Sequence, residues 1–148
     1  MKLLVFHIGA DRYGLRLREV VRVLPLLELK QLPLGPEPVA GLMDFHGQSV
    51  PVIDLCRAAG VAPGADHFDT RIIVVHYPSA DGGAHLLGLR AERVTGVEEI
   101  SEVRLKDSGV QAAPFLGQVA GDAHGMLQLV ELEQLLPAPL RAALFQPS

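Results

Sequence analysis

Histidines are the first residues in this sequence that could do chemistry, because an imidazole can bind a metal ion or carry a proton. The six histidines are His7, His46, His67, His76, His85 and His124. No two share the i,i+4 spacing of a helical metal site, and the single cysteine, Cys56, provides no thiolate set. His46 and His124 each precede a glycine, which is typical of a turn. We predict no metal and no cofactor; a barrel that binds a metal or small ligand through His46 and His124 is the alternative.

Two carboxylates, Asp54 and Glu131, could serve acid–base catalysis. They occupy matching places in the runs Val-Ile-Asp-Leu and Leu-Val-Glu-Leu. A catalytic pair must converge on one substrate, whereas these two repeat, so we expect each to end a strand and cap the short helix that follows. The sequence contains no GxSxG, no phosphate-binding glycine loop and no His-Glu zinc signature. We therefore predict no catalytic residues and no enzymatic activity.

An internal repeat positions these residues. Gly14-Leu15-Arg16 recurs as Gly88-Leu89-Arg90, and the later motifs recur in the same order up to Asp54 and Glu131. The copies therefore lie 74 residues apart at the glycines (88 minus 14) and 77 apart at the carboxylates (131 minus 54). Such self-similarity indicates two small units of similar design within one chain.

Short hydrophobic runs between glycine and proline turns predict the elements. Strands are expected over residues 4–8, 13–17, 39–45, 49–55, 71–77, 84–89, 115–120 and 126–130. Helical spacing is expected from Val20 to Leu24, with short helices over residues 56–59 and 131–136. This pattern favours an all-β fold of two small barrels. They would share one domain over residues 1–136, divided near 1–75 and 76–136 with strand exchange left open, and residues 137–148 form a tail without predicted structure.

The amino-acid composition argues against some classes of binding partner. The net charge of −4 and the aromatic content of 5% without tryptophan argue against nucleic-acid binding. No apolar run approaches membrane-spanning length, and the N-terminus lacks the pattern of a signal peptide. We therefore expect a cytoplasmic protein with no direct membrane insertion.

The sequence resembles the CheW family of chemotaxis coupling proteins in order along nearly its whole length. The most specific match is the middle block from Leu32-Pro33 through Val39-Ala40-Gly41-Leu42 to Gly47-Gln48-Ser49-Val50-Pro51-Val52-Ile53-Asp54-Leu55. Further matches are Phe6-His7-Ile8-Gly9, Tyr13-Gly14-Leu15, Val20-Val21-Arg22-Val23, Thr70-Arg71-Ile72-Ile73-Val74-Val75, Leu87-Gly88-Leu89, Val94-Thr95-Gly96-Val97 and residues 127–136. The resemblance implies two five-stranded, SH3-like barrels with short helices around a shared core.

The resemblance also implies an adaptor without catalysis that couples chemoreceptor tips to a CheA-type histidine kinase, at the inner membrane face where receptor arrays hold it. CheW-like proteins pair with a CheW-like domain of the kinase through the ends of the barrels, and other CheW-like domains are candidate partners. A receptor helix would lie in the groove between the barrels, whose residues by motif position are Val20, Val23, Leu24, Leu27 and Val97. A place in the core is the competing interpretation, above all for Val20 and Val97.

Two departures from the family pattern stand out. Asp44-Phe45-His46-Gly47 replaces the usual Asn-Leu-Arg-Gly, and Arg22 replaces a residue that is often acidic. Strand alternation would put Asp44 and His46 on one face. We expect Arg22, Asp44 and His46 to form a charge cluster facing a partner, with neutral surface drift as the alternative. The departures leave open a divergent CheW-like interaction domain that binds another partner, or a secondary chemosensory pathway.

Overall fold

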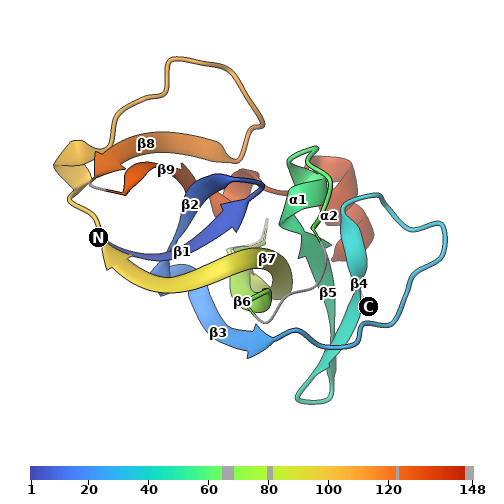
Figure 1. Ribbon diagram of the computed structural model, residues 1–148. Helices are drawn as coiled ribbons and strands as arrows, with labels where there is room; N and C mark the ends of the chain where they lie inside the picture. Colours follow the sequence, from blue (N-terminus) through green and yellow to red (C-terminus); the bar gives the residue numbers. More distant parts are fainter. Residues whose placement is uncertain (65–68, 80–81, 123, 146–148) are drawn as a thin grey trace.

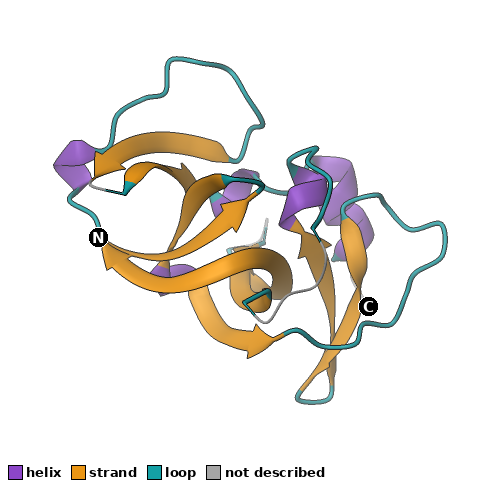
Figure 2. Cartoon of the chain, in the orientation of Figure 1, coloured by secondary structure: helices purple, strands orange, loops and turns teal. Residues whose placement is uncertain are grey.

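The computed structural model describes residues 1–64, 69–79, 82–122 and 124–145, and most of its elements are strands (Figure 2). The strands are β1 (Lys2–Ile8), β2 (Asp11–Arg16), β3 (Val20–Pro25), β4 (Val39–Phe45), β5 (Gln48–Asp54), β6 (Arg71–Pro78), β7 (Ala84–Glu99), β8 (Leu116–Asp122) and β9 (Gly125–Val130). The helices are α1 (Leu55–Ala58), α2 (Ala138–Leu144) and the 3-10 turns η1 (Leu17–Glu19), η2 (Glu102–Arg104) and η3 (Leu132–Gln134). None of the helices within these ranges has the length and hydrophobicity needed to span a bilayer.

The strands form two SH3-like barrels joined by the long strand β7 (Figure 1). Residues 84–91 of β7 pair with β6, and residues 92–99 pair with β1. Barrel A, as named here, has the strand order β7(92–99)-β1-β2-β9-β8. Barrel B has the order β3-β6-β7(84–91)-β5-β4. In each barrel a bridge from the connecting segment closes onto the last hairpin, at Lys106↔Val119 in barrel A and Lys30↔Leu42 in barrel B.

The two sequence repeats exchange strands. Strand β2 of the first repeat pairs in parallel with β9 of the second, and β7 of the second pairs in parallel with β5 of the first. Each barrel therefore combines the first two strands of one repeat with the last three of the other. Strand pairing thus crosses the expected division between residues 75 and 76 in both barrels, and neither half of the chain contains a whole barrel.

The repeated glycine of Gly-Leu-Arg marks a close approach inside each barrel. A Cβ atom on Gly14 would lie 2.9 Å from Leu3 Cδ1. A Cβ atom on Gly88 would lie 2.9 Å from Val52 Cγ2. Both distances are too short for carbon atoms in van der Waals contact, so a Cβ atom at either position would force the neighbouring core side chain to shift.

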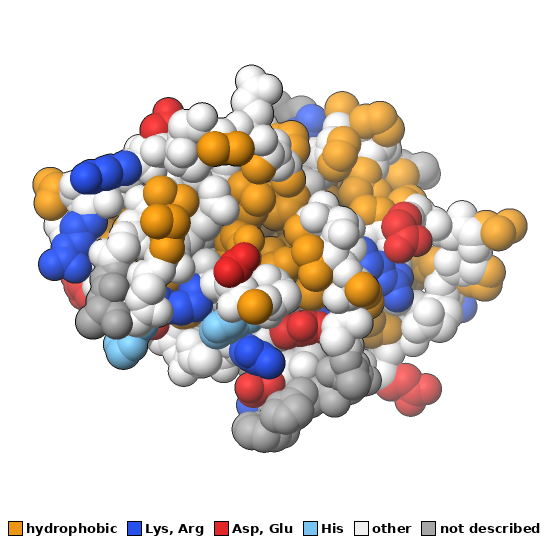
Figure 3. Space-filling model, turned by 45° about the horizontal axis from the view of Figure 1, so that its top comes forward, with side chains coloured by type: hydrophobic (Ala, Val, Ile, Leu, Met, Phe, Trp, Pro, Cys, Tyr) orange, Lys and Arg blue, Asp and Glu red, His pale blue; other side chains and the backbone are white. Residues whose placement is uncertain are grey.

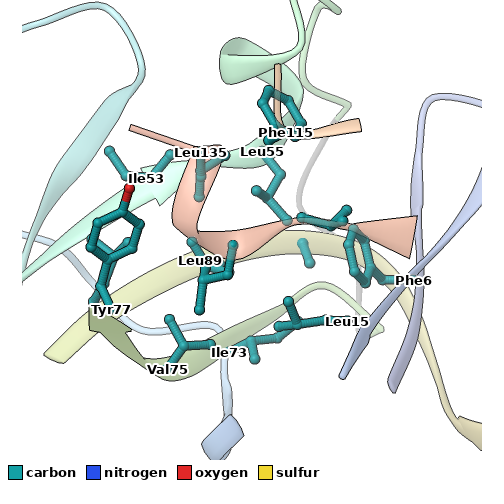
Figure 4. Close-up of a cluster of buried hydrophobic side chains, with 14 of the residues drawn as sticks. Phe6, Leu15, Ile53, Leu55, Ile73, Val75, Tyr77, Leu89, Phe115 and Leu135 are labelled. Atoms are coloured by element: carbon teal, nitrogen blue, oxygen red, sulfur yellow. The ribbon is translucent and has the colours of Figure 1, made fainter. Parts of the chain in front are cut away.

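Three hydrophobic clusters form the interior. The largest lies between the barrels and takes residues from both, including Phe6, Leu15, Ile53, Ile73 and Leu89 (Figure 4). The cluster inside barrel A contains Leu3, Val5, Ile100, Ala120, Leu127 and Leu129. The cluster inside barrel B contains Met43, Val50, Val52, Ile72 and Val74. This central cluster packs the two barrels against each other.

The helix expected from Val20 to Leu24 is wrong, because these residues form strand β3. They pair with β6 in antiparallel register, with Val23 opposite Ile73 and Leu24 opposite Ile72. The spacing of the valines fits a helix, but their β-branched side chains favour a strand once a partner edge is present.

The sequence predicted no structure for residues 137–148, and this is wrong for residues 138–144, which form α2. Leu140, Leu144 and Phe145 pack against the central cluster, and the Phe145 ring stacks on His85 with centroids 4.4 Å apart. So short a helix is unstable by itself and depends on tertiary packing, which local sequence does not reveal.

Candidate partner-binding surfaces

Strand β3 and residues 92–99 of β7 hold equivalent positions in the two barrels. In the ladders of the described residues, β3 pairs only with β6, and residues 92–99 pair only with β1. Each strand therefore has a second edge that no strand ladder covers. Val23 on β3 and Val97 on β7 are related by the repeat, since 97 minus 23 gives the same offset of 74 as the glycines. An uncovered edge with an exposed valine is a surface on which a partner can pack.

The structure divides the five expected groove residues by their exposure. Val97, Val23 and Leu27 are 51%, 39% and 37% exposed. Val20 packs against the central cluster, and Leu24 packs against the cluster of barrel B. Val23, Leu27 and Val97 are therefore available to a partner, whereas Val20 and Leu24 support the strand that carries Val23.

The three residues of the expected charge cluster lie on β3 and on the β4–β5 hairpin. Arg22 is exposed on β3, opposite Val74 of β6. Asp44 Oδ1 accepts a hydrogen bond from the Gly47 N–H at 2.8 Å, which stabilises the hairpin turn. No hydrogen bond or ion pair joins Arg22 to Asp44 or His46, all of which are described. An effect of Arg22 on partner choice stays a prediction.

The alternation argument that put Asp44 and His46 on one strand face is wrong, because β4 ends at Phe45. His46 and Gly47 form the turn, with φ of +53° and +84°. Positive φ at both turn residues is typical of a type I′ hairpin. The His46 ring contacts the Phe45 ring, with centroids 4.5 Å apart at an interplanar angle of 65°.

Asp54 lies in a buried ion pair that joins the two repeats inside barrel B. The Arg90 Nη1 and Asp54 Oδ2 atoms are 3.2 Å apart, and the side chains are 8% and 3% exposed. Asp54 Oδ1 accepts hydrogen bonds from the backbone N–H groups of Cys56 and Arg57 at 2.9 and 3.2 Å. The predicted cap is therefore confirmed at Asp54. The same carboxylate also holds β7 of the second repeat against β5 of the first.

Glu131 forms the equivalent ion pair in barrel A but caps nothing. The two guanidinium nitrogens of Arg16 donate to the Glu131 carboxylate at 2.9 and 3.0 Å. The predicted cap is wrong here, because η3 receives no side-chain hydrogen bond at its N-terminus. A bidentate arginine engages both carboxylate oxygens and leaves less capacity for backbone N–H groups. The matching recurrence of Arg16 and Arg90 was the sequence signal that could have revealed both pairs.

Glu19 on η1 adds a third charge to the pair in barrel A. Its carboxylate lies 3.9 Å from Arg16 Nη1, and its Oε1 atom is buried without a hydrogen bond among the described residues. Burial raises the pKa of the Glu19 carboxyl, and the positive charges of Arg16 and Arg18 offset this only in part. The Glu131 hydrogen bond raises the pKa of Arg16.

The described residues contain no group of three or more histidine, cysteine or acidic side chains that could hold a metal ion. Cys56 is buried, and burial raises the pKa of its thiol. A raised thiol pKa keeps sulfur protonated and weakly nucleophilic.

Hollows at several places indent the surface of the described residues. An apolar cavity of about 300 Å³ lies between α1, α2 and the segment 113–115, lined by residues such as Phe115, Leu135 and Leu140. Figure 3 shows hydrophobic side chains gathered at the centre of one face with charged groups around them. A second cavity of about 720 Å³ opens at the end of barrel A and has several charged residues in its lining.

Comparison with known proteins agrees with this architecture. A family model described as the CheW-like domain matches residues 2–139. The chain belongs to the CheW-like family. It is 26% identical over 140 residues to the chemotaxis protein CheW of Klebsiella aerogenes, covering 90% of this chain and 80% of that protein.

The crystal structure of the scaffolding protein TtCheW from Thermoanaerobacter tengcongensis has the same fold. The two structures superpose with a TM-score of 0.80 at 26% identity, covering 90% of each chain. This CheW-like chain therefore has the two-barrel architecture of a chemotaxis scaffold.

Proposed function

We propose that this CheW-like protein is a non-catalytic adaptor that couples chemoreceptors to a CheA-type histidine kinase in the cytoplasm. The observation that carries the proposal is the match of the CheW-like domain to residues 2–139. The scaffold role of TtCheW, which shares the fold, supports it. The uncovered edges of β3 and β7, with exposed aliphatic side chains, provide surface for protein contacts.

The receptor would contact Val23, Leu27 and Val97. These residues are the exposed members of the expected groove, and an amphipathic helix binds such a surface through apolar side chains at helical spacing. Val20 and Leu24 would act indirectly, because they fix β3 against the core. The kinase would bind through the barrel ends, as the resemblance to the CheW family implies.

The test uses the purified chain with a receptor-tip fragment and a CheA-type kinase fragment from the same organism. Val23→Asp and Val97→Asp should weaken receptor binding by about tenfold or more, because a carboxylate in an apolar contact must lose its hydration. The control is Val103→Asp, since Val103 is 87% exposed on η2 and lies outside the proposed contact. Calorimetric titration measures affinity, and melting temperature verifies folding.

Three outcomes separate the possible functions. Loss of receptor binding only in the Val23 and Val97 variants supports the groove. If these variants bind the receptor fragment as tightly as the parent, Val23 and Val97 do not form the receptor contact, although the adaptor function still stands. No binding of either fragment by the parent contradicts the adaptor and favours a divergent CheW-like domain with another partner.

A further inference from the structure

Strand β7 passes from barrel B to barrel A at residues 91–93. Ala91 is its last residue paired with β6, and Glu92 is its first paired with β1. Figure 1 shows β7 as one long curved strand that runs from beside β6 to beside β1. The first repeat crosses between the barrels at the equivalent place, because η1 plus the repeat offset of 74 gives residues 91–93. Each crossing directly precedes the strand segment that carries an exposed valine, Val23 or Val97.

Arg93 has an unusual backbone conformation at this crossing. Its φ is +49°, and among the non-glycine residues of the described strands it alone has a positive φ. The left-handed region is unfavourable for a residue with a Cβ atom, whereas glycine adopts it without strain. Because this position holds an arginine and not a glycine, contacts from the rest of the fold must maintain the conformation.

One peptide group, between Arg93 and Val94, receives these contacts on both sides. The Arg93 carbonyl oxygen lies 3.3 Å from Nδ1 of His7 on β1, and since a carbonyl oxygen can only accept, Nδ1 donates. The N–H of the same peptide group, at Val94, donates to the Asp69 carbonyl oxygen at 3.0 Å. Asp69 lies just before β6, so an element of barrel A holds the carbonyl and a segment leading into barrel B holds the N–H. The Arg93–Val94 peptide is therefore fixed in orientation.

The Arg93–Val94 peptide lies inside a bulge of the β1–β7 ladder. Val5 pairs with Gly96 and His7 pairs with Glu92, so three residues of β7 lie opposite one residue of β1. Two additional residues in β7 displace the later part of that strand along β1 by about 7 Å, at roughly 3.4 Å per residue. The bulge therefore sets the register of the strand segment that follows it.

The position of Val97 depends on this register. Val97 lies opposite Leu4, and it is 51% exposed beside the uncovered edge of β7. An unbulged ladder that continued from the pair of His7 and Glu92 would place Val97 opposite Lys2 instead, at the start of β1. Strand β3 has a bulge at a corresponding place, before its own exposed valine. The place of each exposed valine is therefore set by a bulge and not by regular pairing alone.

We propose that the Arg93–Val94 peptide positions Val97 for the receptor contact, and that His7 and Arg93 act as positioning residues rather than as contacts. This use of the peptide rests on the proposed function, whereas its restraint by His7 is measurable in the free protein. Without the restraint the bulge relaxes, so that only a fraction of the molecules presents Val97 in the binding position. The apparent affinity for the receptor falls by that fraction.

The first experiment compares His7→Leu, which removes the donor, with His7→Asn, whose side-chain amide keeps an N–H near the position of Nδ1. Amide hydrogen exchange at Val94, followed by NMR in the free protein, should be about tenfold faster in His7→Leu and near the parent rate in His7→Asn. The nuclear Overhauser contact between Leu4 and Val97 should weaken only in His7→Leu. His76→Leu is the control, since His76 is exposed on β6 outside the crossing.

A second pair of variants separates backbone conformation from charge. Arg93→Gly and Arg93→Val both remove the guanidinium, but glycine accepts a φ of +49° and the branched valine does not. Arg93→Gly should keep the receptor-tip affinity within about twofold of the parent, whereas Arg93→Val and His7→Leu should each weaken it by about fivefold or more. Calorimetric titration measures the affinity, and melting temperature verifies that each variant is folded.

The outcomes distinguish the restraint, its use and the coupling function. Loss of affinity in His7→Leu and Arg93→Val, with recovery in His7→Asn and Arg93→Gly, supports the proposal. Unchanged exchange at Val94 in His7→Leu would overturn the restraint. Faster exchange with unchanged receptor affinity would overturn the positioning role. If the parent binds no receptor fragment, the coupling function and the positioning role fail together, while the exchange rate still decides whether His7 restrains the peptide.

Discussion

Barrels A and B share one strand order, yet they are filled differently. The repeat offset of 77 residues relates Met43 in barrel B to Ala120 in barrel A, and both side chains are buried. The cluster of barrel B is further covered by partly buried residues such as Leu24, Leu26 and Leu29, whereas that of barrel A is covered by Met1 and Leu105. A topology can thus be repeated while its packing diverges. Barrel A, with the smaller side chain, is also the barrel whose end opens into the large cavity.

The ion pairs between repeats show the same divergence. In barrel B the Arg90 and Asp54 side chains are 8% and 3% exposed, while in barrel A those of Arg16 and Glu131 are 22% and 28% exposed. A buried charge that loses its partner recovers little hydration, whereas a charge that is about a quarter exposed recovers more. Equivalent positions should therefore contribute unequally to stability.

The largest expected effect comes from removing the buried carboxylate. Asp54→Ala should lower the free energy of unfolding by about 2–4 kcal/mol, because Arg90 loses its most buried partner and keeps Glu92, at 3.4 Å, while α1 loses its cap. Glu131→Ala should cost only about 1–2 kcal/mol, because Arg16 can reach water. Denaturant unfolding followed by circular dichroism measures both. Equal losses would contradict the contrast drawn between the barrels.

Substitutions at the two repeated glycines should lower stability by similar amounts, which would show that the barrels do not differ at every equivalent position. Gly14→Ala and Gly88→Ala should each cost about 1–3 kcal/mol, because the added Cβ atom overlaps a core side chain in both barrels. Gly121→Ala is the control, since nothing lies within 4 Å of its Cβ position. Denaturant midpoints provide the measurement. A loss at only one of the two glycines would show that the barrels differ in backbone approach as well as in filling.

Glu19 gives barrel A a pH dependence that can be tested. Its folded pKa is raised, so the folded state binds the proton more tightly than the unfolded chain, and the buried charge destabilises the fold at neutral pH. Glu19→Gln should therefore raise the melting temperature at pH 7. The gain should shrink as the pH falls through the raised pKa towards the reference value of 4.5, where the parent carboxyl becomes neutral.

Glu37→Gln, at an exposed position in the connection between β3 and β4, is the control for that pH series. This variant removes one glutamate carboxylate that is not part of the group formed by Arg16, Glu19 and Glu131. A gain at Glu19 that is independent of pH between about 4.5 and 7 would rule out burial of its charge as the cause.

The smallest expected effect concerns partner choice at barrel B. Changing Arg22→Glu together with His46→Arg should shift the preference among kinase and receptor partners severalfold, because exposed charges contribute about 0–1 kcal/mol each and act mainly on specificity. Competition binding between partner fragments from different chemosensory pathways measures that preference. An unchanged preference would identify the substitutions as surface drift.

Local patterns were sufficient for much of the fold. The β4–β5 hairpin was predicted from two hydrophobic runs around a glycine turn, and its strands end at Phe45 and begin at Gln48 as expected to within a residue. The repeated Gly-Leu-Arg correctly indicated two units of one design. Strand β3 was mistaken for a helix, because its valines satisfy a helical period and only the β6 edge selects the extended conformation.

The candidate site was predictable in its residue types but not in their orientation. Val20, Val23, Leu24, Leu27 and Val97 were chosen by position in a family motif, and the sequence could not say which of them face outward. The direction of each side chain depends on strand register and on the bulge between Val20 and Arg22, which the β6 ladder sets. Repeated arginines and carboxylates were visible, but their pairing required knowledge of which strands are neighbours.

The sequence by itself determined the all-β class, the duplication, the turns and the absence of strong basic character, because these depend on local composition and spacing. Tertiary structure alone decided that the repeats exchange strands, that Asp54 is paired with Arg90, and that α2 completes the core. These features join residues far apart in the chain. Their stability comes from burial and pairing, which exist only when both partners are in place.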